Sequence, residues 1–236
     1  MATAFSDVWA DFWAWMESHS AGAYLFRGQA DASPIIPKIG RPSFNYDRAR
    51  ERDLFNAFKR AARPFVGLLA SDWEWLALAQ HHGAPTRLAD WSTSPLVAAW
   101  FAVTSFPEGT DAMVFALGLA RADLEILDIA TGETASGSSV REPLAITKGV
   151  YLIETPPVSA RITTQRGIFT LHGSPTTPIA VSTAETFVIP KDMRHNFQGR
   201  LLDLGIDASH IYPDLDGLCK TLDWRLKSGK GFSSIG

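Results

Sequence analysis

The sequence predicts an α+β fold in which a helical first half packs on a mainly antiparallel β second half. Up to about residue 104, apolar residues recur at helical spacing. From residue 112 onward, short apolar runs alternate with turns rich in Gly, Pro and Ser. The 236 residues show no internal repeat and no shift of composition. We therefore expect a single domain, 1–236, with an N-terminal helix within 1–20 and a flexible tail at 228–236.

A helix, a strand and a second helix are expected before residue 70. Ser6 is placed to cap a helix that ends near Ser18 and carries a wide apolar face. The run Tyr24–Gln29 is short and aromatic, as in a strand, and leads into a proline-rich loop. Residues 47–69 separate charged from apolar side chains at helical spacing, and Pro64 is expected to interrupt or end that helix.

Two further helices flank a polar segment. The S-x-x-E pattern that begins at Ser71 is typical of a capping box and predicts a helix over 72–82. Ser94, followed by a proline, predicts the start of a helix over 95–104. Residues 84–91 between them fit an irregular connector or a short strand.

The second half is expected to be mainly β, with one closing helix. Turn residues divide it into short apolar segments. The expected strands are 112–119, 149–153, 167–171 and 186–189, and the expected helix is 214–227.

Charge, cysteine content and hydropathy limit the classes of function. Lys plus Arg number 22 and Asp plus Glu number 25, so the net charge of −3 argues against nucleic-acid binding through bulk positive charge. A single cysteine, Cys219, excludes an intramolecular disulfide and any multi-cysteine metal site. No apolar run is long enough to span a membrane, and the first 20 residues do not resemble a signal peptide. We therefore expect a cytoplasmic protein without a membrane partner.

The common enzyme motifs are missing from the sequence. It contains no GxGxxG, P-loop, HExxH, CxxC or GxSxG pattern. Polar groups concentrate instead within two hydrophobic segments, 26–29 and 80–94. These segments are the candidates for a site.

Arg27 is the first candidate site residue. It follows three apolar residues, so a strand would carry its guanidinium to the edge of the core, and Gly28 would let a ligand approach the backbone beside Gln29. This arrangement suits a clamp for a phosphate or carboxylate. The alternative is a structural arginine paired with a buried carboxylate such as Asp90 or Asp214.

His81 and His82 end a predicted helix and have two interpretations. Histidines in a last turn complement the negative end of the helix dipole, and they can equally contact a ligand. Adjacent residues point to different faces of a helix and no third ligand is near in sequence, so we expect no metal.

The segment 86–94 holds six hydrogen-bonding side chains directly before a predicted helix N-terminus, a place that suits a sugar and a phosphate. Capping and turn formation would account for Ser94 and Asp90, but not for Thr86, Arg87 or Ser92. We expect a ligand site here.

Gln165 and Arg166 precede Gly167 and the expected strand 167–171, which repeats the pattern of a polar group beside a glycine and a strand. These side chains either reach the same cleft or belong to a hairpin turn.

Four motifs together resemble the FRG domain family, which is named for the first of them. They are F-R-G-Q at 26–29, Q-H-H-G-A-P-T-R-L-A-D-W at 80–91, Q-R-G-I-F at 165–169 and Y-P-D-L-D-G-L at 212–218. They occur in this order, and the resemblance extends over about 24–226.

A weaker resemblance links the chain to ADP-ribosyltransferases of the Arg/Ser/Glu type. Arg-Gly at the end of an early strand, followed by a Ser/Thr cluster that leads into a helix, is similar to the first two motifs of that family. The resemblance implies a split sheet, Arg27 on the phosphates or ribose of NAD, and Ser92 or Ser94 beside the nicotinamide.

The third element of that pattern, a glutamate, has no clear match. Gln165 occupies the corresponding place; it can hydrogen-bond a hydroxyl but cannot act as a base. Glu154 and Glu185 are the other candidates.

We therefore hypothesise an NAD- or nucleotide-binding domain that transfers ADP-ribose to a protein or nucleic acid, as a toxin or defence effector. One alternative is a nucleic-acid-processing enzyme or binder that uses His81, His82 and a cluster of arginines, and another is a noncatalytic nucleotide-sensing or interaction module. The candidate catalytic residues are Arg27, Ser92 and Gln165, and the candidate ligand-binding residues are Arg27, Gly28, Gln29, His81, His82, Thr86, Arg87, Asp90 and Ser94. The cluster proposed for the nucleic-acid alternative comprises Arg27, Arg87, Arg161 and Arg166.

Overall fold

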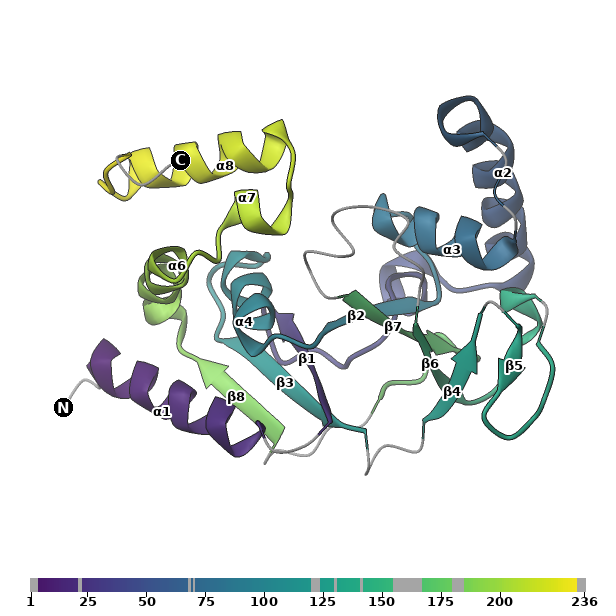
Figure 1. The fold of residues 1–236 in the computed structure, drawn as a ribbon, viewed down its shortest axis with the longest axis horizontal. Coiled ribbons are helices and arrows are strands. Elements are labelled where there is room, and N and C mark those ends of the chain that lie inside the picture. The colour runs from purple at the N-terminus through teal and green to yellow at the C-terminus, as the bar shows by residue number, and fades with distance from the viewer. Residues whose placement is uncertain are drawn as a thin grey trace.

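The α+β prediction is confirmed. A computed structural model describes residues 4–20, 23–67, 69, 71–119, 124–129, 131–140, 142–154, 167–179 and 185–232 (Figure 1). The helices are α1 Phe5–Ser18, α2 Arg48–Val66, α3 Asp72–His81, α4 Pro95–Thr104, α6 Arg194–Asp203, α7 Ala208–Ile211 and α8 Leu215–Lys227. The strands are β1 Tyr24–Gln29, β2 Leu88–Ser92, β3 Ala112–Gly118, β4 Glu125–Asp128, β5 Glu133–Thr134, β6 Val150–Glu154, β7 Gly167–His172 and β8 Thr186–Ile189.

The strands form one sheet in the order β5-β4-β6-β7-β2-β1-β3-β8. Neighbouring strands are antiparallel except for the parallel pair β4 and β6. The two strands of the first half of the chain, β1 and β2, lie at the centre of this sheet. Strands from the second half therefore extend it on both sides.

The contact between β1 and β2 is much shorter than the neighbouring ladders. β1 pairs with β3 from Tyr24 to Gln29, and β2 pairs with β7 along its whole length. Between β1 and β2 the register contains only the pair Phe26 and Ser92. Beyond this pair the two strands separate, so the sheet is divided at its centre into two ladders.

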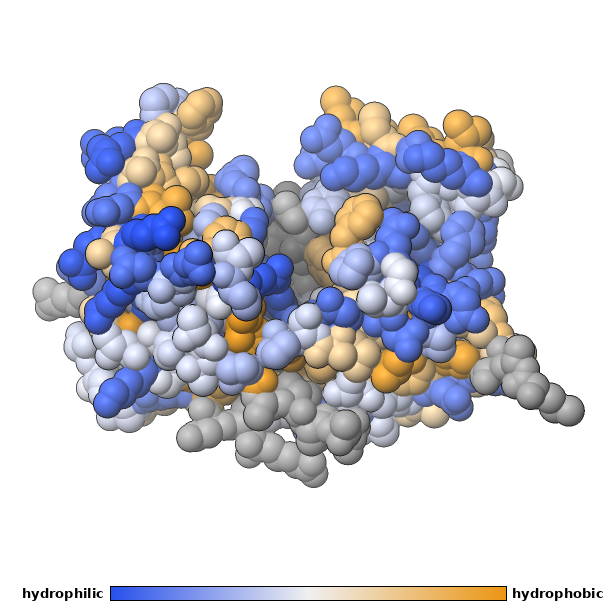
Figure 2. All heavy atoms as spheres, turned by 180° about the vertical axis from the view of Figure 1, so that it is seen from behind, coloured by the Kyte–Doolittle hydropathy of each residue, from blue (hydrophilic) through white to orange (hydrophobic). Residues whose placement is uncertain are grey.

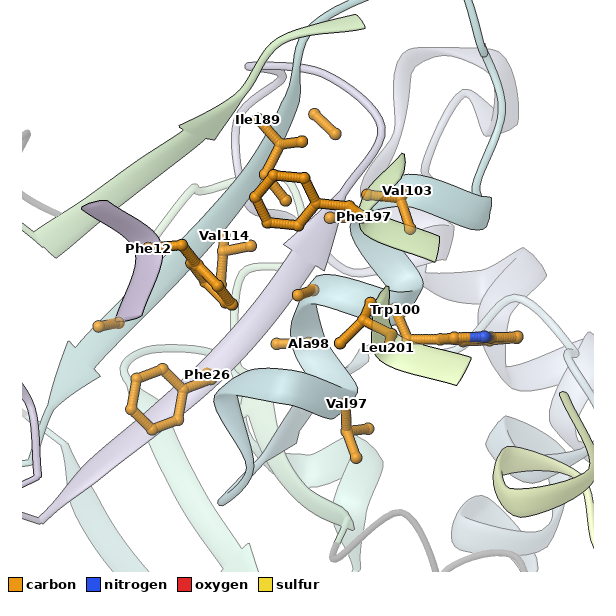
Figure 3. Close-up of a cluster of buried hydrophobic side chains, with 14 of the residues drawn as sticks. Phe12, Phe26, Val97, Ala98, Trp100, Val103, Val114, Ile189, Phe197 and Leu201 are labelled. Carbon is orange, nitrogen blue, oxygen red and sulfur yellow. The ribbon is translucent and has the colours of Figure 1, made fainter. Parts of the chain in front are cut away.

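The β1–β3–β8 ladder is covered by the apolar helix α4, with α1 and α6 beside it (Figure 3). Phe12 of α1 and Phe197 of α6 are fully buried and meet edge to face with ring centroids 5.6 Å apart. Phe26 and Val114 contribute to the same cluster from the sheet. This core fixes β1 firmly against α4.

The β2–β7–β6–β4 ladder has a separate core under α2 and α3. Trp73 and Trp75 of α3 and Phe55 of α2 pack on Leu171 and Ile153 of the sheet. The outer helices of the two ladders, α2 on one side and α8 on the other, stand apart, and an open notch lies between them at the upper edge of the molecule (Figures 1 and 2).

Arg194 of α6 holds the chain that follows α4. It is buried, and its guanidinium donates hydrogen bonds to five backbone carbonyls, so the last turn of α4 and the next loop are fixed to α6. Within that loop Phe106 is 82 % exposed. The five carbonyls belong to Ala102, Val103, Ser105, Pro107 and Thr110.

One local expectation is wrong: α1 begins at Phe5 with Ala4 as its N-cap, and no side chain caps it, so Ser6 lies inside the helix. α2 ends near Pro64, as expected: Pro64 lies within its last turn and the helix ends at Val66 before Gly67, whose φ is +76°. None of the helices described here is long and apolar enough to cross a membrane.

Candidate functional site

A cavity of about 860 Å³ lies where β1 and β2 separate. Its walls come from the end of β1, the loop over 30–42, the C-terminal end of α3, the strand β2, and one side of α4 with the loop after it. Beyond Phe26 and Ser92, the edges of β1 and β2 that face each other are not paired. The division of the sheet therefore leaves room for the cavity. We call it the cleft.

Arg27 joins the two walls of the cleft. Its Nη1 donates to the backbone carbonyl of Asp90 at 2.5 Å, and its Nε donates to Oε1 of Gln29 at 3.2 Å. Nη2 has no hydrogen-bond partner among the described residues. Burial lowers the pKa of Arg27, the Asp90 carboxylate opposes this shift and Arg41 adds to it. The Arg27 side chain thus connects β1 to β2 by a hydrogen bond to a carbonyl and not by a buried ion pair. Its Nη2 can still donate hydrogen bonds in the cleft.

Arg87 lies apart from the cleft, inside the core. Its side chain is 0 % exposed and does not line the cleft. Nε and Nη2 donate to the two carboxylate oxygens of Glu51 at 2.7 and 2.5 Å, and Nη1 donates to the carbonyl of Ile146 at 2.7 Å. Tyr46 also contacts Glu51, and burial followed by the Glu51 charge raises its pKa to about 12. Arg87 is therefore held inside the core by Glu51 and Ile146, and its side chain lies outside the lining of the cleft.

Gly28 lines the cleft, and its contact with α4 explains why this residue is a glycine. A Cβ atom at this position would lie 1.9 Å from the carbonyl oxygen of Ala98 and 2.5 Å from the backbone nitrogen of Ala102. The glycine therefore allows β1 to lie directly on α4. Close packing of strand and helix, not the approach of a ligand, requires it.

Ser92 and Ser94 have different roles. Ser92 is buried and lines the cleft, and its Oγ accepts a hydrogen bond from the backbone nitrogen of Ser94 at 3.0 Å. Ser94 is the N-cap of α4, where its Oγ accepts from the backbone nitrogen of Val97 at 3.4 Å. Ser94 does not line the cleft, and the capping interpretation accounts for its side-chain contact.

Asp90 and Thr86 are connected by a side chain that the sequence analysis did not select. Gln80, in the last turn of α3, donates from Nε2 to Oδ2 of Asp90 at 2.8 Å. Thr86 is buried, does not line the cleft, and its Oγ1 lies 2.5 Å from Oε1 of Gln80. Thr86 therefore lies behind the wall of the cleft. Gln80 and Thr86 both belong to the motif at 80–91, but their spacing of six residues, across a helix end and a turn, does not by itself indicate a contact.

His81 and His82 both line the cleft at the end of α3, and their rings meet edge to face with centroids 4.9 Å apart. Lys38 of the opposite loop also lines it and donates to the carbonyl of Gly83 at 2.6 Å, which fixes the loop to the end of α3. Within the described residues, no group of three His, Cys, Asp or Glu side chains is arranged to hold a metal.

The third motif is only partly described. Gln165 and Arg166, like Arg161, lie outside the described residues, so their expected place in the cleft stays a prediction. β7 begins at Gly167, which pairs with Ser92. Glu185, just before β8, does not line the cleft.

A buried polar chain lies behind the cleft wall. Trp91, which lines the cleft, donates from Nε1 to Oγ1 of Thr170 at 3.0 Å, and that hydroxyl lies 3.2 Å from Nε2 of His172. The Thr170 hydroxyl accepts from Trp91 and keeps one O–H that it can donate to Nε2 when this ring nitrogen is unprotonated. Burial, together with the charge of Arg27, lowers the pKa of His172 to about 4. His172 is therefore neutral at physiological pH.

Comparison with known proteins identifies the segment that forms most of the cleft. A family model of the FRG domain matches residues 22–110, which extend from β1 through α4. The chain thus carries an FRG domain, and the match includes the first two of the four motifs. No curated protein and no solved structure gives a significant match to the chain.

Proposed function

We propose that the cleft binds NAD or a related nucleotide and that the protein transfers ADP-ribose from NAD to a macromolecule. The observation that carries this proposal is the position of the cleft. It opens at the division between two ladders of the sheet, with Arg27 on one strand and Ser92 on the other. The resemblance to ADP-ribosyltransferases associates these two residue types with a dinucleotide in a split sheet.

The chemistry of the lining suits a dinucleotide. Arg27, Lys38 and Arg41 supply positive charge for a diphosphate, and guanidinium groups bind phosphate oxygens in pairs. Phe101 and Phe106 offer aromatic surface on which a base can stack. The cavity volume of about 860 Å³ lies within the range of small-molecule sites.

In this proposal Arg27 neutralises a phosphate and Ser92 orients the ribose next to nicotinamide. Positive charge develops on that ribose as nicotinamide leaves, and fixed protein dipoles stabilise it without reorganisation. The acceptor is a protein or a nucleic acid.

The first experiment is a thermal-shift panel with NAD, ADP-ribose, ATP, GTP, a short RNA and a short DNA. It compares wild type with Arg27→Ala and with Arg52→Ala, a control in which an exposed arginine of α2 is removed. A ligand at 100 times its Kd stabilises the folded state by about 2.7 kcal/mol, which such a panel detects. We expect NAD or ADP-ribose to raise the midpoint of wild type and Arg52→Ala but not of Arg27→Ala, and NAD to release nicotinamide.

The other hypotheses give different results in the same panel. A shift with RNA or DNA alone would support a nucleic-acid enzyme, although the burial of Arg87 removes one member of the arginine cluster proposed for it. A shift with a nucleotide but no release of nicotinamide would support a sensing module.

A further inference from the structure

Asp90 is an exposed carboxylate in the lining of the cleft. Among the described residues, the acidic side chains that line the cleft are Asp31 and Asp90. Asp31 accepts a hydrogen bond from the backbone nitrogen of Ser33 at 2.9 Å, which stabilises its own loop. Asp90 is exposed, and its Oδ1 has no hydrogen-bond partner in the described part of the chain. One oxygen is therefore left to accept a proton or a hydrogen bond from a ligand.

The other oxygen of Asp90 is held by a chain of hydrogen bonds with a fixed direction. The chain starts at the backbone nitrogen of Leu88, which can only donate, and it donates to Oγ1 of Thr86 at 3.1 Å. The Asp90 carboxylate only accepts, so the Gln80 amide atom that faces its Oδ2 is Nε2, which donates. Oε1 of Gln80 then faces Thr86 and accepts from the Thr86 hydroxyl.

Arg27 fixes the backbone of the same residue. Its hydrogen bond to the Asp90 carbonyl and the hydrogen bond from Gln80 to the Asp90 carboxylate come from opposite walls of the cleft. Both the main chain and the side chain of Asp90 are thus held in place. Such restraint is expected of a group whose position matters for chemistry.

We propose that Asp90 is the catalytic carboxylate of the transfer reaction and that Gln80 and Thr86 are positioning residues that orient it. This inference rests on the proposed function. As the bond between the ribose C1′ and the nicotinamide nitrogen breaks, its electron pair leaves with nicotinamide. The nucleophilic atom of the acceptor bonds to C1′, and its proton passes to Oδ1 of Asp90 and then to solvent. Asp90 would supply the base that Gln165 cannot supply.

The test of the catalytic role is Asp90→Asn, with Asp53→Asn as the matched control at an exposed carboxylate of α2 outside the cleft. Binding of ADP-ribose is measured by calorimetry and release of nicotinamide from NAD by chromatography. Removal of a general base costs about 100-fold or more in rate. We expect that loss for Asp90→Asn with an ADP-ribose Kd within about threefold of wild type, and a rate close to wild type for Asp53→Asn. A rate for Asp90→Asn within about threefold of wild type would overturn the inference.

The positioning role is tested with Thr86→Val and Thr86→Ser. Valine removes the hydroxyl that orients Gln80, while serine keeps it. We expect the valine variant to lose about tenfold in rate without loss of ADP-ribose binding, and the serine variant to recover the wild-type rate. An unchanged rate in the valine variant would contradict this role.

The role of Asp90 and the proposed function can be disproved separately. An active wild type with an equally active Asp90→Asn overturns the role of Asp90 and leaves the proposed function standing. A wild type that neither binds ADP-ribose nor releases nicotinamide overturns the proposed function and the role of Asp90 with it.

Discussion

Arg27 and Arg87 stand in two regions of the FRG segment that look alike in sequence but differ in structure. Both are single arginines within polar motifs beside apolar residues. The region of Arg87 is closed by Glu51, which accepts two hydrogen bonds from the guanidinium inside the core. The region of Arg27 is open, because a carbonyl and an amide oxygen are its partners and a cavity lies beside it. A buried carboxylate partner, not the motif, distinguishes the arginine inside the core from the arginine at the cleft.

The largest effect that would test this comparison is expected at Arg87. The Arg87→Met variant leaves Glu51 buried without its cation, and breaking a buried pair on one side costs about 3–5 kcal/mol. Urea denaturation of the variant measures the loss. The double variant Arg87→Met with Glu51→Leu should recover part of it, since no charge is then left buried. A loss below about 1 kcal/mol for the single variant would mean that the pair does not stabilise the fold.

A smaller loss of unfolding free energy is expected for a substitution at Gly28, next to Arg27, that pushes β1 away from α4. In Gly28→Ala the new Cβ overlaps the Ala98 carbonyl, and overpacking of this kind costs about 1–3 kcal/mol. Gly109→Ala is the matched control, since nothing lies within 4 Å of its Cβ position. Equal stability of the two variants in urea would show that β1 can move off the helix at little cost.

We expect the free energy of unfolding to depend on pH through His172, which lies behind the wall of the cleft. In the unfolded chain this ring protonates near its usual pKa of 6.5, whereas in the folded chain it does so only near 4. As pH falls between these values the unfolded state binds the proton, so the free energy of unfolding falls by up to about 1.4 kcal/mol per pH unit. Above pH 6.5 the ring contributes no pH dependence. Urea denaturation from pH 7.5 to 4 should show a shallower decline for His172→Gln than for wild type; parallel curves would mean that the ring is not held neutral.

The smallest effect on stability is expected at Arg27 itself. Arg27→Ala removes two hydrogen bonds at a solvent-accessible cleft and leaves no charge buried without a partner, so the free energy of unfolding should fall by about 1 kcal/mol or less. The same variant should lose ligand binding. Urea denaturation of Arg27→Ala and Arg87→Met under the same conditions compares the two arginines directly. Equal losses of unfolding free energy in the two variants would mean that Arg27 is structural as well.

Elements with local signals could be predicted from the sequence. The caps Ser71, Asp47 and Ser94 mark the starts of α3, α2 and α4, and Asp214 caps α8. The bounds of α4 and β8 agree with the expected ones. In contrast, β4 is short and α6 has no side-chain cap, so neither gives a comparable signal.

The candidate site was predictable only in part, because its geometry depends on contacts between distant residues. Arg27, Ser92 and Asp90 come together at the cleft because β1 and β2 are neighbours in the sheet, and the two segments were selected for their local polarity. The partner of Arg87, Glu51, lies 36 residues away on another helix, and no spacing rule connects them. The role of Gln80 likewise appears only when the end of α3 is seen beside β2.

The hydrogen bonds of Arg194 have a consequence for binding entropy. The loop that carries Phe106 borders the cleft, and it is fixed by carbonyls that accept from one buried guanidinium. Its conformational freedom is therefore lost when the protein folds and not when a ligand arrives. Because this loop is already ordered, a ligand that contacts the Phe106 ring causes little further loss of conformational entropy when it binds. This side of the cleft should therefore select ligands by shape instead of adapting to them.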